Sequence, residues 1–174
     1  MANKQLNFAI PTNFRFFCSE IPVTSELAQD VTLPSINMGQ AQVPNRFVDY
    51  NLPGEKIVYA EIDVGFSMDE NYDAYAEIYS WMERMCGVTG SGVPESERKL
   101  LFADAEITLL DNTGNMIRKI IFHDAWPVSI GAMALDVSSD ASPVKTILTM
   151  DYTSMSIVPG TKNLSELAAI RYNH

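Results

Sequence analysis

The segment from Leu101 to Val158 constrains the fold of this chain most strongly. Polar and apolar residues alternate along much of it, a pattern typical of strands with one dry and one wet face. Asp111–Gly114 separates two such runs and contains residues that tolerate the positive φ of a hairpin turn. The segment therefore predicts antiparallel strands joined by short connections. It contains no grouping of residues typical of a reaction centre.

Strand signals recur along the rest of the chain, whereas one segment has clear helical periodicity. Because hairpins rather than crossover helices separate the strands, we expect a mainly β protein, an antiparallel β-sandwich or barrel with one flanking α-helix. Strands are predicted at Asn13–Ile21, Ala28–Leu33, Ile57–Ser67, Leu101–Leu110, Met116–Trp126, Ala132–Val137 and Lys145–Ile157.

The predicted helix covers about Glu70–Cys86. Its apolar residues recur at helical spacing, with Asp69 as a suitable N-cap and Gly87 as a suitable C-cap. This spacing places its aromatic and methionine side chains in the core or at a subunit interface, and not in a cofactor pocket.

The segment 36–56 has no clean periodicity and interrupts the strand pattern with glycines and prolines. It carries more apolar groups than a solvated linker needs, so we expect an irregular arm that covers a partner surface. The candidate contact residues are Val43, Phe47, Val48, Tyr50 and Leu52. We expect one domain over residues 1–174, with this arm, a flexible loop at 87–99 and a C-terminal tail at 159–174.

The composition excludes several classes of protein. The chain has 174 residues and a net charge of −10, and it lacks the Lys/Arg cluster with which a nucleic-acid-gripping protein neutralises phosphates. Cys18 and Cys86 fit no metal-ligand spacing, and we interpret them as reduced thiols of a cytoplasmic product. No signal peptide and no membrane-spanning run is evident, so no membrane insertion is expected.

The candidate chemical groups are few. His123 precedes Asp124, but adjacent strand residues point to opposite faces, so we interpret His123 as structural. Two carboxylate pairs, Glu61 with Asp63 and Asp104 with Glu106, each project from one strand face. They could form a divalent-ion site or an acid/base pair, an ordinary solvated face, or an acidic wall facing something that must not bind. The solvated face is the preferred interpretation for either pair alone, and no cofactor or metal is expected.

The order of elements resembles the tail tube proteins of contractile-tailed bacteriophages (myoviruses). The resemblance spans about residues 13–157, with an arm around LPSINMGQAQVPNRFVDYNLPG and a strand IVYAEIDVGFSM that leads into the helix DENYDAYAEIYSWMERM. Its most specific pieces are the join Phe66–Tyr72, Trp126–Gly131, Leu135 with Asp136, and Met150–Tyr152.

This resemblance implies a structural virion protein that is made in the host bacterial cytoplasm. Hexameric rings would stack into a tube, one sheet of each subunit lining the lumen through which double-stranded DNA passes. The implied partners are other copies of the chain, the tail sheath protein, and the baseplate and tail terminator proteins. The resemblance, together with the alternation along the strands and the negative net charge, makes five residues candidates for an acidic wall of the lumen. These are Glu61, Asp63, Asp104, Glu106 and Asp151.

Three alternatives stay open on the sequence. The nearest is another tube protein, such as a baseplate tube initiator or the tube subunit of a type VI secretion or phage-tail-like injection machine. A monomeric β-sandwich would instead need a concave apolar pocket for a small ligand. An enzyme using the paired carboxylates is the third class, and we expect no such activity.

Overall fold

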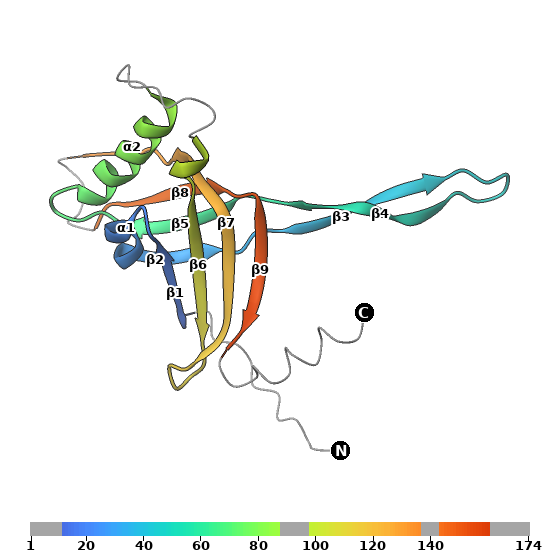
Figure 1. The fold of residues 1–174 in the computed structure, drawn as a ribbon, viewed down its shortest axis with the longest axis horizontal. Helices are drawn as coiled ribbons and strands as arrows, with labels where there is room; N and C mark the ends of the chain where they lie inside the picture. The colour runs from blue at the N-terminus through green and yellow to red at the C-terminus, as the bar shows by residue number, and fades with distance from the viewer. Residues whose placement is uncertain (1–11, 88–97, 137–142, 161–174) are drawn as a thin grey trace.

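The computed structural model describes residues 12–87, 98–136 and 143–160. Strands dominate these residues, two α-helices and one 3-10 turn accompany them, and adjacent strands pair antiparallel (Figure 1). The elements in chain order are β1 (Phe14–Cys18), α1 (Pro22–Leu27), β2 (Ala28–Thr32), β3 (Ile36–Val43), β4 (Tyr50–Tyr59), β5 (Ile62–Ser67), α2 (Asp73–Cys86), η1 (Arg98–Leu101), β6 (Ala103–Leu110), β7 (Met116–Ile130), β8 (Lys145–Asp151) and β9 (Ser154–Pro159).

Two sheets share the long strand β7. The first, sheet A, has the order β1-β6-β7-β9 and uses the first half of β7. The second, sheet B, has the order β7-β8-β5-β2 and uses the last residues of β7, from Trp126 to Ile130. The predicted class, an antiparallel β-sandwich or barrel with a flanking helix, is confirmed. A second, six-residue helix, α1, was not predicted.

The passage of β7 between the sheets occurs at Asp124, which has a left-handed backbone (φ 52°). The register of β6 against β7 shifts at this point, as at a β-bulge that bends a strand. The expected strand Lys145–Ile157 breaks at the same corner into β8 and β9, where Thr153 N–H donates to the His123 carbonyl (3.0 Å). At this corner the core-facing positions change parity, from Phe122 to Ala125 along β7 and from Tyr152 to Met155 between β8 and β9. A simple two-residue alternation therefore could not predict where the expected strand breaks.

The core lies between the sheets and beneath α2. Inward residues of β5, β6, β7 and β8 are buried, and α2 adds Ala74, Ile78 and Trp81 from one face. The Trp81 indole N–H donates to the Leu101 carbonyl (2.8 Å), so its polar atom is satisfied inside the core. Burial of these alternating residues is the physical basis of the strand pattern in the sequence.

The helix α2 begins three residues later than expected. Tyr72 stands before it with a left-handed backbone (φ 60°), and the Asp69 carboxylate accepts the N–H groups of Asp73 and Ala74 (3.0 and 3.2 Å). Asp69 therefore satisfies helix N–H groups from outside the N-cap position. Gly87 ends the helix with φ 65°, as predicted.

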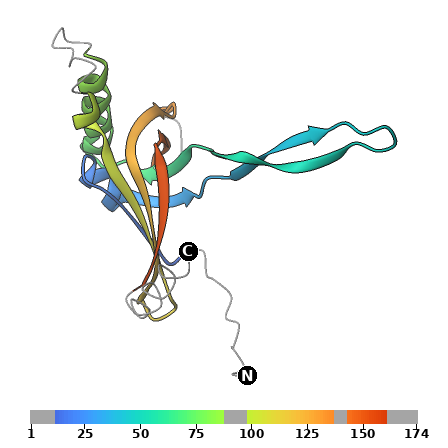
Figure 2. The same cartoon turned by 45° about the vertical axis from the view of Figure 1, so that its right-hand side comes forward.

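The predicted irregular arm is a β-hairpin, which corrects the expectation for segment 36–56. β3 and β4 pair antiparallel from Ile36↔Tyr59 to Val43↔Tyr50 and extend far from the sandwich (Figures 1 and 2). The register shifts between Met38 and Gln40, and a Cβ on Gly54 would lie 2.5 Å from the Gly39 carbonyl oxygen. The glycines are needed where the two strands approach closely, and both faces of the hairpin are exposed. The sequence therefore lacks the alternation of polar and apolar residues from which strands are predicted.

Three further expectations have different outcomes. No strand forms over 132–136, and residue 137, the end of that predicted strand, lies outside the described part of the chain. Of the predicted loop 87–99, residues 88–97 lie outside the described part of the chain, and Arg98 and Lys99 belong to η1 and not to a loop. Residues 161–174 of the predicted tail also lie outside the described part. Within the described residues, no helix has the length and apolar character needed to cross a membrane.

Candidate assembly surfaces

The hairpin β3–β4, called the arm below, carries a series of uncovered apolar side chains. Phe47 is 86% exposed and Val48 is 72% exposed, and both lie in the loop between the two strands. Tyr50 and Leu52 are about half exposed, and Val43 is partly buried. All five predicted contact residues therefore lie at or near the distal part of the arm. Exposed apolar groups gathered in this way are characteristic of an interface.

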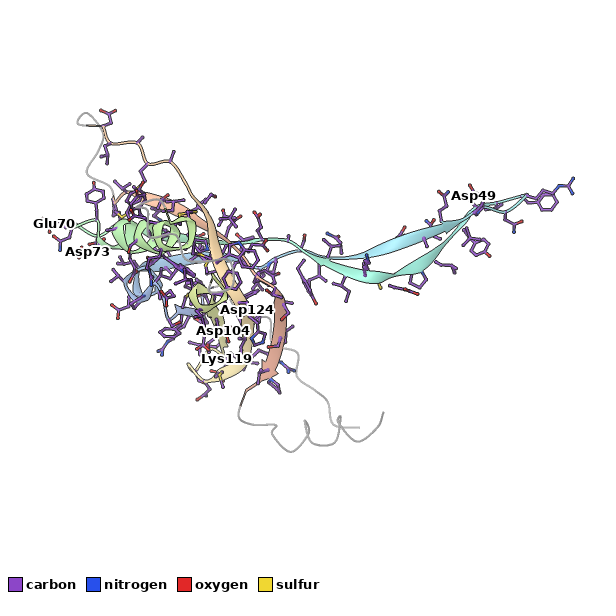
Figure 3. The ribbon with its side chains drawn as sticks, turned by 45° about the horizontal axis from the view of Figure 1, so that its top comes forward. Asp49, Glu70, Asp73, Asp104, Lys119 and Asp124 are labelled. Atoms are coloured by element: carbon purple, nitrogen blue, oxygen red, sulfur yellow. The ribbon has the colours of Figure 1, made fainter. Side chains whose placement is uncertain are left out.

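The loop at the distal end of the arm is held by one carboxylate. Asp49 accepts the Asn45 backbone N–H (3.2 Å) and the Gln42 side-chain N–H (3.3 Å), and it lies near the far end of the arm in Figure 3. The Arg46 guanidinium stands 5.8 Å from the centre of the Phe47 ring. These contacts give the loop a defined shape once the two strands of the hairpin are paired.

Three predicted acids belong to the outer side of sheet B. Asp63 projects outward from β5 and accepts the Thr149 hydroxyl (2.8 Å), and Asp151 ends β8. Glu61 precedes β5 and is exposed. A fourth acid, Asp30 on the neighbouring strand β2, was not predicted from the sequence. Its carboxylate lies over Gly65, and a Cβ on Gly65 would be 2.4 Å from Asp30 Oδ1.

The other two predicted acids lie on the outer face of sheet A. Asp104 and Glu106 alternate with buried alanines on β6, and Glu106 forms an ion pair with Lys119 of β7. Arg15 on β1 pairs in register with Thr108, so a second cation borders the same face. Sheet A therefore balances its carboxylates with cations, while the outer side of sheet B has several carboxylates and one exposed cation, Lys145 at the start of β8.

His123 has a carboxylate partner that sequence reasoning missed. Its Nδ1 lies 3.4 Å from Asp104 Oδ2 and its Nε2 lies 2.8 Å from Ser156 Oγ. The bulge beside it turns the Asp124 N–H toward Asp104 Oδ1 (3.2 Å), and Figure 3 places Asp104 and Asp124 together. Counting register outward from the 111–114 turn would have brought Asp104 close to His123. The contacts tie β6, β7 and β9 together across sheet A.

The sandwich, the outreaching arm and the exposed apolar groups together define a protein that functions by association. A comparison with protein-family models identifies the class of protein more narrowly. Residues 7–158 match the model of the phage tail tube protein family. The chain belongs to this family and is a structural tail tube subunit, not an enzyme. The expected resemblance to tail tube proteins is thereby confirmed.

Solved structures with the same fold come from contractile particles. A chain of the anti-feeding prophage baseplate aligns with a TM-score of 0.65 at 18% identity, over 91% of this chain and 99% of that one. A chain of an extracellular contractile injection system, from the PVC sheath-tube complex in the extended state, aligns with 0.64 at 13% identity over 89% and 94%. A chain of the anti-feeding prophage tube-terminating cap aligns with 0.63 at 14%, over 92% and 100%. No curated protein sequence matches the chain.

Proposed function

We propose that this subunit forms hexameric rings that stack into the inner tube of a contractile phage tail, through which double-stranded DNA passes. The observation that carries this proposal is the arm, a two-stranded hairpin whose distal apolar side chains, Phe47 and Val48 above all, are exposed in the described part of the chain. Such a surface needs a neighbour, and repeated contacts between identical subunits build rings and filaments. The tail sheath, baseplate and terminator proteins would be its further partners, and the virion its location.

Free strand edges support ring formation. β1 and β9 at the edges of sheet A, and β2 at the edge of sheet B, each pair with one strand within the described residues. An unpaired strand edge presents backbone N–H and carbonyl groups that a neighbouring chain can complete. Pairing of such edges between neighbouring subunits would satisfy these backbone groups.

The acidic residues support a bore that repels DNA. The outer faces of the two sheets point away from a common core, so we infer that only one of them lines the bore. The charge balance favours sheet B, with Glu61, Asp63 and Asp151, over sheet A, with Asp104 and Glu106. A like-charged wall lets a polyanion slide without binding.

A second candidate is the tube of a contractile injection particle that carries no genome. Its support is the shared fold with chains from the anti-feeding prophage and the PVC particle, and a baseplate tube initiator would share this fold as well. The two candidates differ in cargo and not in the way the subunit assembles.

Negative-stain microscopy of the purified protein at high concentration tests the tube proposal. We expect hollow tubes or stacked rings with six-fold symmetry in end views. A protein that stays monomeric at every concentration and salt level, and that adds to no preformed tube, would refute the proposal.

Neutralising each acidic face tests the bore. The triple variant Glu61→Gln, Asp63→Asn, Asp151→Asn should still form tubes but slow DNA ejection, because phosphates would meet fewer repelling charges. The matched variant Asp104→Asn, Glu106→Gln should leave ejection unchanged. The reverse outcome would assign the bore to sheet A, and no effect of either variant would remove the acidic wall from the proposal.

A further inference from the structure

We propose that the distal end of the arm, residues 44–49, inserts into a groove between β1 and α1 of a second copy of this chain. This inference rests on the proposed tube function and names both sides of one of its contacts. It joins two surface features that would otherwise have no role. One is the exposed pair Phe47 and Val48 at the end of the arm, called the knob below, and the other is a partly apolar groove.

The groove has a volume of about 380 Å³ and runs beside the free edge of β1. Phe14 and Phe17 of β1 line one side, and Pro22 and Ala28 at the ends of α1 line the other. Arg15 and Glu26 also border it, so it presents an apolar floor with one charge of each sign.

The knob is formed by Phe47 and Val48, the two most exposed apolar residues of the arm. A cavity of about 150 Å³ suffices to bind benzene, so the groove has room for the Phe47 ring and the Val48 side chain together. The hydrogen bonds to Asp49 hold the knob in one shape, which lowers the entropy lost on docking.

The charges of the two surfaces are complementary. The knob residues are flanked by Arg46 on one side and Asp49 on the other, while the groove is bordered by Glu26 and Arg15. Docking can pair Arg46 with Glu26 and Asp49 with Arg15. Opposed charges of this kind fix the orientation of a contact more than they raise its affinity.

The positions of the two surfaces make the occupant another copy. The arm leaves one side of the sandwich, and α1 and β1 lie at the opposite side in both views (Figures 1 and 2). The knob therefore cannot reach the groove of its own chain. A contact between two different surfaces on opposite sides repeats head to tail and propagates a polymer.

A charge exchange tests the pairing without removing the apolar knob. Arg46→Glu alone and Glu26→Arg alone should each raise the critical concentration for assembly, and the double variant should restore it toward the wild-type value. Phe47→Ala should raise it about 10–100-fold, the range expected for a buried aromatic anchor. Asn51→Ala, on the arm but outside the knob, is the matched control and should leave assembly unchanged.

Cross-linking gives a direct readout that does not depend on assembly strength. Val48→Cys combined with Glu26→Cys, in a Cys86→Ser background, should give a covalent ladder of multimers from oxidised tubes. Either cysteine alone should give none. If wild-type tubes form but no ladder appears and Phe47→Ala assembles normally, the knob does not occupy the groove, and the tube proposal survives. If the wild type forms no tubes at any concentration and adds to no preformed tube, both proposals fail.

Discussion

At the scale of single residues, the core is specified by a few side chains whose polar atoms have fixed partners. Thr24 is fully buried in α1, and its hydroxyl and N–H both donate to the Glu77 carboxylate of α2 (3.1 Å each). Trp81 is fully buried and donates to the Leu101 carbonyl. Burial of these groups is possible because each has a hydrogen-bond partner.

Replacing Trp81 with Phe should destabilise the subunit by about 1–3 kcal/mol, because the Leu101 carbonyl would lose its buried donor. For a chain of this length each kcal/mol lowers Tm by about 2–4 °C. Calorimetry on unassembled protein measures the shift. Trp126→Phe is the matched control: Trp126 is partly buried against Phe102, and its indole N–H has no partner in the part of the chain that the structure describes. Equal shifts in Tm for the two variants would show that the hydrogen bond from Trp81 to the Leu101 carbonyl does not contribute the predicted stability.

The two thiols should differ strongly in reactivity. Burial raises the pKa of the Cys18 thiol from its usual 9.0 to about 11, whereas Cys86 is exposed. At pH 8 a thiol reagent should therefore label one cysteine of the folded chain quickly, and Cys86→Ser should abolish that reaction. The stability due to a neutral buried Cys18 is complete below pH 9 and declines between pH 9 and about 11, since the unfolded thiol ionises first. Cys18→Ala should flatten the fall of Tm over this range.

At the scale of elements, the sequence predicted the strands and α2 well because burial imposes a period on them. The alternation along β6 and β8 corresponds to a buried and an exposed face, and the Asp111–Gly114 turn joins β6 to β7 as expected. The predictions failed where burial does not alternate. The arm exposes both faces, and the sheet corner at Asp124 depends on a bulge that no local pattern marks.

Removing Gln40–Leu52 should leave a folded subunit that does not polymerise. β3 and β4 pair with each other and not with the sandwich, and the residues at the cut, Gly39 and Pro53, already lie near each other because Gln40 pairs with Pro53. The shortened chain should keep a cooperative unfolding transition and sediment as a monomer. Normal tubes from this variant would show that the arm is dispensable for assembly.

At the scale of the whole molecule, assembly must overcome mutual repulsion. The subunit has a net charge of −10, which sequence composition alone predicts. The sequence predicted the positions of the acids only in part. Alternation correctly predicted that Asp63 and Glu106 lie on outer faces, but only the strand topology shows that they lie on two different sheets. The charge of each face therefore depends on which strands are neighbours, as the pair Glu106–Lys119 illustrates.

Salt should promote polymerisation of the purified chain. The screening length falls from about 10 Å at 0.1 M to about 3 Å at 1 M, which weakens repulsion between subunits while apolar contacts persist. Raising NaCl from 0.05 to 0.5 M should lower the critical concentration several-fold, as measured by sedimentation. Weaker assembly at high salt would mean that attractive ion pairs between subunits outweigh the overall repulsion.

The isolated geometry of the arm has a kinetic consequence. A two-stranded hairpin is marginally stable in water by itself, and the arm has no third strand to support it. The first docking event must therefore order an arm as well as join two subunits, whereas later subunits meet arms that are already held. Growth from a preformed end should be fast and spontaneous initiation rare, so a solution of subunits should show a lag phase that short tube seeds abolish. Such a subunit remains soluble until a template is present, and the template decides where a tube starts.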